Sequence, residues 1–295
     1  MARLLAPLLL AWLWLLSRLP LPLLAPLGRG VGRLMWALAG SRRTVALRNL
    51  ELCLPELGEP RRREIAREHF ALIGRSVFEY GLSWYASRER LKRLIKVEGD
   101  VALAERSGRP VMWLVPHFVA LDIAAVAVQL FQSRPVVSVY MPASNPVWEA
   151  VIRRKRLRFG GGGRLFSRFE SARALMRSVR EGYCFFNLPD MDFGERDAAF
   201  VPFFGVSAAT LLAPSRLARA LDMLVQPVVA EVLPGGRGWR VRFLDPLPDF
   251  PSDDAVADTQ RINQWIEQEV RRMPEQYLWV HKRFKTRPAG EPTLY

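Results

Sequence analysis

The stretch VMWLVPHFVALD, residues 111–122, decides how this chain folds. Its apolar half, Val111 to Val115, lies between two prolines and is typical of a short buried strand. Its second half carries a histidine and an aspartate, and residues 123–131 then show the spacing of a helix. A buried strand that passes through a short polar loop into a helix predicts an α/β sheet.

The same alternation continues along the rest of the chain. We expect further strands at residues 136–140, 183–188, 225–232 and 239–244. We expect helices within residues 41–96, including 61–80, and at 146–159, 169–181, 208–221 and 255–272. Neither an internal repeat nor a long linker interrupts these elements. The sequence therefore predicts a central mixed sheet flanked by helices in an α/β fold.

Composition limits the class of protein. The chain has 295 residues, half of them hydrophobic and 24% charged, which excludes a disordered or collagen-like protein. Its 43 Lys and Arg against 29 Asp and Glu leave a formal net charge of +14. Such a charge attracts nucleic acid, anionic lipid, phosphorylated substrates or an acidic carrier protein. A membrane-tethered nucleic-acid-binding protein is the remote alternative, since the basic residues are spread along the chain without a recognised nucleic-acid module.

Residues 4–27 are apolar apart from Ser17 and Arg18. The stretch is not followed by the cleavage site of a secretory signal peptide. Arg18 also makes the uninterrupted apolar part shorter than a full transmembrane helix requires. An anchor that enters the bilayer obliquely, with Arg18 reaching the headgroups, fits best. We therefore expect a membrane anchor over residues 1–28 and a single domain over 29–295. The arginines that follow the anchor favour a cytoplasmic position for that domain: Arg29, Arg33, Arg42, Arg43 and Arg48.

The histidine of the opening stretch has a carboxylate five residues later, in the pattern His117-x4-Asp122. A carboxylate that binds one ring nitrogen fixes the tautomer, so the other nitrogen can take a proton. With a hydroxyl-bearing substrate, His117 would then act as general base and Asp122 would orient it. A His and Asp at a strand end also form purely structural pairs, but α/β sheets place their sites at this position.

Polar and basic residues elsewhere supply further candidates. Asn187 and Asp190 end another expected strand and can orient a polar substrate, although a plain turn also uses these residues. The acidic residues after Asp190 lack the order of a calcium loop, so no metal site is expected. Basic residues before and after the four glycines 160–163 form either a solvated face or a clamp for phosphate or an acidic partner: Arg153, Arg154, Lys155, Arg156, Arg158, Arg164 and Arg168. Near the C-terminus, Lys282 and Arg283 alternate with aromatic residues, which suits a headgroup interface or nucleic acid.

Taken together, these segments resemble the late acyltransferases of lipid A biosynthesis, the lauroyl/myristoyl family of Gram-negative inner membranes. The resemblance covers nearly the whole chain. It differs at Met141, where many members have Arg, and at the glycine run 160–163. The matching segments are Arg42-Arg43, NLELCLPE (49–56), His117-x4-Asp122, Tyr140-x4-Asn145-Pro146, RLFSR (164–168), Asn187-x-x-Asp190, DFG (192–194), FVPFFG (200–205) and WVHKRFK (279–285).

The resemblance implies a single-pass anchor in the inner membrane and a cytoplasm-facing domain of the glycerolipid acyltransferase type. It implies transfer of a fatty acyl chain from acyl carrier protein to a hydroxyl of a Kdo-bearing lipid A precursor, without a cofactor. His117 and Asp122 match the catalytic dyad, Arg164 is a possible oxyanion or phosphate contact, and Asn187 and Asp190 match other motif positions. Related membrane acyltransferases that use a lysophospholipid, an ornithine lipid or a glycolipid are the alternatives.

Overall fold

A seven-stranded mixed sheet forms the centre of the protein in the computed structural model, which describes residues 2–295 and the side chains of residues 7–295. The strand order is β1-β9-β8-β2-β5-β3-β4, and a separate hairpin pairs β6 with β7. The strands are β1 (Ile95–Gly99), β2 (Val111–Leu114), β3 (Val136–Tyr140), β4 (Arg164–Ser167), β5 (Cys184–Asn187), β6 (Ala198–Phe203), β7 (Val206–Leu211), β8 (Leu224–Val232) and β9 (Trp239–Phe243).

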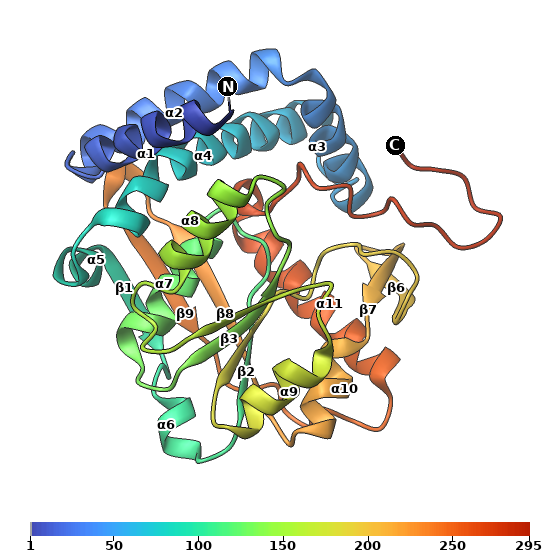
Figure 1. The fold of residues 1–295 in the computed structure, drawn as a ribbon. Helices are drawn as coiled ribbons and strands as arrows, with labels where there is room; N and C mark the ends of the chain where they lie inside the picture. The colour runs from blue at the N-terminus through green and yellow to red at the C-terminus, as the bar shows by residue number, and fades with distance from the viewer. Residues whose placement is uncertain (1) are drawn as a thin grey trace.

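Helices cover both faces of the sheet, and a layer of N-terminal helices closes one end of it (Figure 1). The helices are α1 (Ala2–Leu16), α2 (Leu21–Leu38), α3 (Gly40–Cys53), α4 (Glu59–Tyr85), α5 (Arg88–Leu94), α6 (Leu103–Ser107), α7 (Leu121–Phe131), α8 (Pro146–Arg156), α9 (Ala172–Arg180), α10 (Ala213–Ala220) and α11 (Ala255–Arg272). The α/β fold with a mixed central sheet is therefore confirmed.

Strand β2 is buried on both sides, as its continuous apolar run predicts. Its side chains alternate between two cores: Val111 and Trp113 pack on one face, Met112 and Leu114 on the other. β2 is parallel to both neighbours, β8 and β5. β5, β3 and β4 continue in the same direction, so the carboxyl ends of four adjacent strands meet at one edge. That edge carries the candidate site.

One predicted helix is wrong in its first half. Residues 206–211 form strand β7, and the helix begins only at Ala213. The cause is the turn at Phe204 and Gly205, which both have positive φ (52° and 75°) and so connect β6 to β7 as a tight hairpin. The apolar residues after this turn then pair with β6 instead of starting a helix.

The N-terminal helices α1 and α2 pack against the long helix α4 (Figure 1). Residue 28, where the anchor is expected to end, lies inside α2. Glycines let α2 approach α4 closely: a Cβ on Gly32 would lie 2.1 Å from the carbonyl oxygen of Phe70. Among the helices of residues 2–295, none combines the length and the hydropathy needed to cross a bilayer.

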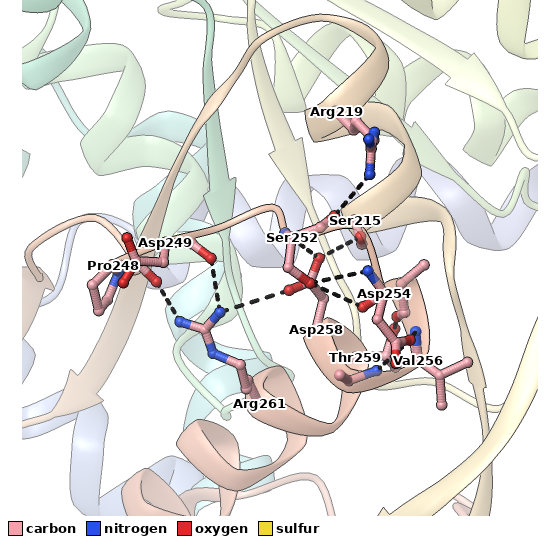
Figure 2. Close-up of polar contacts among 12 residues, drawn as sticks. Ser215, Arg219, Pro248, Asp249, Ser252, Asp254, Val256, Asp258, Thr259 and Arg261 are labelled. Carbon is pink, nitrogen blue, oxygen red and sulfur yellow. Dashed lines mark hydrogen bonds and ion pairs between the residues drawn. The ribbon is translucent and has the colours of Figure 1, made fainter.

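The opposite part of the fold depends on Asp258, whose side chain is buried in the first turns of α11 (Figure 2). Its carboxylate accepts hydrogen bonds from the Ser215 hydroxyl (2.7 Å) and from the Ser252 backbone N–H (2.9 Å). Arg261 lies 3.6 Å away and also donates to the backbone of Asp249. These contacts join α10, α11 and the loop between β9 and α11, and they have a structural role.

Candidate active site

Strand register brings His117 and Asp190 together. β2 and β5 are parallel neighbours, and Leu114 lies opposite Asn187. His117 and Asp190 each follow three residues beyond this pair. The segments that follow β2 and β5 leave the same edge of the sheet in register. The side chains of His117 and Asp190 therefore meet, although they are 73 positions apart in the sequence.

Two hydrogen bonds join these residues. The His117 Nδ1 atom lies 2.7 Å from Asp190 Oδ1, and the His117 backbone N–H donates to Asp190 Oδ2 at 2.9 Å. Burial raises the pKa of Asp190. The charge and hydrogen bonds of His117, together with the charge of Arg283, outweigh this effect, so the pKa of Asp190 lies below its usual range. The ionised carboxylate accepts a hydrogen bond from Nδ1–H, so in the neutral ring Nε2 carries no proton. A ring held in this way can accept a proton from a substrate.

Asp122 does not orient His117 in this structure. It accepts a hydrogen bond from the Tyr80 hydroxyl on α4 at 2.6 Å, and Arg156 lies 3.6 Å from its other oxygen. Asp122 lies in the first turn of α7, on the side of that helix that faces α4. The ring partner expected from the sequence is thus corrected from Asp122 to Asp190.

Arg164 also lies elsewhere than expected. It begins β4 opposite Val137 near the start of the parallel strand β3, so it occupies the edge remote from His117. Its guanidinium binds the Ser178 hydroxyl at 2.9 Å, pairs with Glu181 and lies over the ring of Tyr183. These contacts leave no role for Arg164 as an oxyanion contact beside His117. Arg168, which follows the carboxyl end of β4, lies at the same edge as His117.

Asn187 ends β5 at the edge of the site. Its backbone carbonyl accepts a hydrogen bond from Val115 N–H at 2.9 Å, which extends the pairing of β5 with β2. Its side-chain oxygen is buried and has no hydrogen-bond partner among the described residues. A buried amide oxygen in this state can accept a hydrogen bond from a bound molecule.

The expected basic clamp divides into two groups. Lys155 and Arg158 donate to backbone carbonyls at the end of α4, which fixes α8 there. Arg153 and Arg168 both contact Tyr140: the Arg153 guanidinium donates to its hydroxyl at 3.0 Å, and the Arg168 backbone N–H donates to its backbone carbonyl at 2.9 Å. Among the described residues, four of the expected cations are exposed and have no carboxylate partner: Arg153, Arg154, Arg168 and Lys282.

The C-terminal aromatic and basic segment is partly buried in the core, although Lys282 and Lys285 remain exposed. Trp279 and Phe284 are buried, and Arg283 is 3% exposed. The segment supports the site from behind, because Leu278 N–H donates to the His117 carbonyl at 2.9 Å. Arg283 was expected, with Lys282, to bind an external anion such as a lipid headgroup, phosphate or the acidic carrier protein, but its buried side chain cannot reach a partner outside the protein.

Three residues of the site have roles that the sequence did not reveal. Tyr80 binds Asp122, as described above. Tyr277 lines the small cavity behind His117. Its burial, and secondly the negative charge of Asp190, raise the pKa of Tyr277 well above the usual value. His281 accepts a hydrogen bond from the Asp192 N–H at 3.2 Å, and burial lowers its pKa to about 4. The only sequence signal for the last two was their place in the 277–285 segment.

A second cavity, of about 70 Å³, opens beside Asp122 and Arg156 between α7, α8 and the sheet. Its wall is mainly aliphatic, and its far end meets Gln129 and the glycine run at Gly160 and Gly163. The aliphatic part consists of Leu121, Ala125, Val128, Val136, Val139, Leu157, Leu165 and Leu188. In the part of the chain that the structure describes, no group of three His, Cys, Asp or Glu residues is placed to hold a metal ion.

A His–Asp pair at the carboxyl edge of an α/β sheet, in a protein with an apolar cavity beside Asp122, is equipped for base-assisted chemistry on a partly apolar substrate. The profile of the bacterial lipid A biosynthesis acyltransferases matches residues 2–286. The chain belongs to this family and is an acyltransferase.

Curated relatives agree with this assignment. The chain is 32% identical to the lipid A biosynthesis lauroyltransferase of Escherichia coli K12 over 286 residues, which cover 96% of this chain and 92% of the relative. It is 34% identical to the myristoyltransferase of the same organism, over 93% of this chain and 83% of the relative. A lipid A biosynthesis acyltransferase of Haemophilus influenzae is 33% identical over 94% of this chain and 89% of its own length. The family supports acyl transfer onto lipid A.

Proposed function

We propose that this protein transfers a fatty acyl chain from the thioester of acyl carrier protein to a hydroxyl of a Kdo-bearing lipid A precursor. His117 is the general base, and Asp190 orients it. The observation that carries this proposal is the 2.7 Å hydrogen bond from His117 Nδ1 to a fully buried carboxylate. This bond leaves Nε2 free for the hydroxyl proton.

The chemistry needs no nucleophile from the enzyme. The acceptor hydroxyl oxygen attacks the thioester carbonyl carbon while its proton moves to His117 Nε2. The tetrahedral intermediate then expels the carrier thiolate as the carbon–sulfur bond breaks. The thiolate takes the proton from His117, and the products are an ester and a free thiol. No cofactor is required, because the thioester is already activated.

The aliphatic cavity beside Asp122 is suited to the acyl chain. Its wall offers hydrocarbon contacts, and its polar end, Asp122 with Arg156, lies where α7 begins just after the His117 loop. A fatty chain loses its contact with water there, which stabilises binding by about 0.8 kcal/mol per buried CH₂ group. The exposed arginines near Tyr140 are suited to the phosphates of the acceptor or to the acidic carrier protein.

We further propose that α1 and α2 attach the protein to the cytoplasmic face of the inner membrane without crossing it. One side of each helix packs on α4, and the other exposes large apolar side chains, including Trp14 and Leu27. Helices of this kind lie in the headgroup region with one face in the acyl layer. The exposed large apolar side chains of α1 and α2 are Leu8, Leu9, Trp12, Trp14, Leu15, Leu23, Leu27, Val31, Leu34 and Leu38.

A donor and acceptor panel tests the proposed reaction. Lauroyl, myristoyl and palmitoyl chains are offered as carrier-protein and CoA thioesters to the tetraacylated Kdo-bearing precursor, and products are read by mass spectrometry. We expect one added chain with the carrier-protein thioester, and none with His117→Ala. Product on a lysophospholipid, an ornithine lipid or a glycolipid, with none on the precursor, would contradict the proposed acceptor.

A further inference from the structure

Arg283 carries a buried charge that no ion pair among the described residues neutralises. Only 3% of its surface is exposed. Its guanidinium donates to the Ala209 carbonyl at 2.8 Å and to the Thr210 hydroxyl at 2.6 Å, and it lies over the ring of Phe203. Its Nε atom is buried without a partner. A cation removed from water in this way requires a compensating negative charge nearby.

Asp190 supplies a negative charge beside Arg283. Arg283 and Asp190 line the same cavity, which also contacts His117. The cavity measures about 10 Å³, close to the space that one water molecule needs. Asp190 is itself buried, and Arg283 is among the charges that lower its pKa. The two charges therefore compensate each other across a small polar space.

The other titratable groups around this cavity do not replace Arg283. Cys53 on α3, Tyr277 and His281 face it, and burial raises the pKa of both Cys53 and Tyr277, which therefore stay uncharged. Burial lowers the pKa of His281 to about 4, so it is neutral as well. Other charged groups act on these neutral residues: Lys285 acts on His281, and Glu267, Arg271 and Glu56 act on Cys53. Glu267 also accepts a hydrogen bond from Phe204 N–H.

We propose that Arg283 is a positioning residue that acts through Asp190. Its buried positive charge keeps the Asp190 carboxylate ionised, and the ionised carboxylate keeps the His117 ring in the orientation that exposes Nε2. This inference rests on the proposed role of His117 as general base. It assigns Arg283 an electrostatic function, in place of the contact with an external anion that its sequence context favours.

The acidic limb of the pH–rate profile tests this function. Arg283→Met removes the charge, so the His117–Asp190 unit takes up its proton more readily, and transfer is lost at higher pH than in the wild type. We expect the limb to move upward by about half a pH unit or more. Arg283→Lys keeps the charge and leaves the limb near its wild-type position. Thr210→Val removes one hydrogen bond to the guanidinium but no charge, so it lowers thermal stability without moving the limb.

A double-mutant cycle on thermal stability tests the charge pair without using catalysis. Asp190→Asn leaves the positive charge of Arg283 without a compensating negative charge. Arg283→Met leaves the negative charge of Asp190 without the positive charge of Arg283. If the two charges compensate each other, the double variant is more stable than the sum of the single effects predicts. Additive effects together with an unmoved acidic limb would overturn the proposal. Should Arg283→Met fail to fold, Arg283→Gln retains amide donors for Ala209 and Thr210 and carries both readouts. If the wild-type protein transferred no acyl chain, the proposed function would be contradicted. The double-mutant cycle would still show whether the charges of Asp190 and Arg283 compensate each other.

Discussion

At the scale of single residues, the hydrogen bond at Nδ1 decides what His117 can do. With Asp190 bound there, the ring presents Nε2 as an acceptor and is only 13% exposed in its side chain. An imidazole without such a partner populates two tautomers, and only one of them can take the proton of a hydroxyl. In the proposed mechanism, the pairing therefore determines the fraction of enzyme molecules that are ready to react.

The sequence identifies the members of this site better than it identifies their pairing. The histidine, Asp122, Asn187 and Asp190 are all visible as motifs at strand ends. That Asp190 and not Asp122 binds the His117 ring depends on the register of β2 and β5. These strands are far apart in the sequence, so local sequence patterns do not reveal their register. Arg164 was misplaced for a related reason: β4 is short and mixes polar with apolar residues, so its direction was not predicted.

At the scale of elements, the strands that alternate with helices follow from hydrophobic periodicity. β3 and α11 have the predicted limits, whereas β1, β4, β6 and β7 were not predicted as strands. β1 and β4 mix charged or polar with apolar residues and so lack the continuous apolar run of a buried strand. β6 is apolar throughout but contains Pro202, which weakens the signal of a strand. The position of α7 matters most for the site, because its first residues turn Asp122 toward α4.

The contact between α2 and α4 yields a prediction about stability. Gly32→Val places a Cβ within 2.1 Å of backbone atoms on α4, so the helices must separate. We expect a loss of about 3 kcal/mol or more in the free energy of unfolding, measured by denaturant titration in detergent. Gly30→Val is the matched control, since a Cβ at this position on the same helix meets nothing within 4 Å. Equal stability of the two variants would contradict the close approach of α2 to α4.

At the scale of the whole molecule, the apolar face of α1 and α2 and the net charge of +14 both favour an anionic membrane surface. This helical layer covers the end of the fold near α4 and α8 (Figure 1). Tyr80 on α4 contacts Asp122 of the candidate site, so the layer and the site are joined directly. A lipid acceptor bound at the membrane would thus meet the enzyme near its site.

Vesicle flotation tests this attachment. The double variant Leu23→Glu/Leu27→Glu places charges on the exposed face of α2, where the two leucines are 58% and 54% exposed. We expect at least about a tenfold loss of binding to phosphatidylglycerol vesicles at high salt, because two apolar side chains no longer enter the acyl layer. Val256→Glu changes an exposed apolar residue on α11 and should leave binding intact. Equal flotation of the double variant and the wild type would show that α2 does not contact lipid.

The comparison that tests the central claim most directly is the rate of acyl transfer by Asp190→Asn and by Asp122→Asn. Our account predicts that Asp190→Asn lowers kcat by at least about 100-fold, because the amide no longer selects the reactive tautomer. Asp122→Asn should cause a smaller loss, mainly in KM, since Asp122 lines the proposed acyl cavity and does not bind the ring. The reverse order, with transfer abolished in Asp122→Asn and retained in Asp190→Asn, would contradict the assignment of Asp190 as the partner of His117.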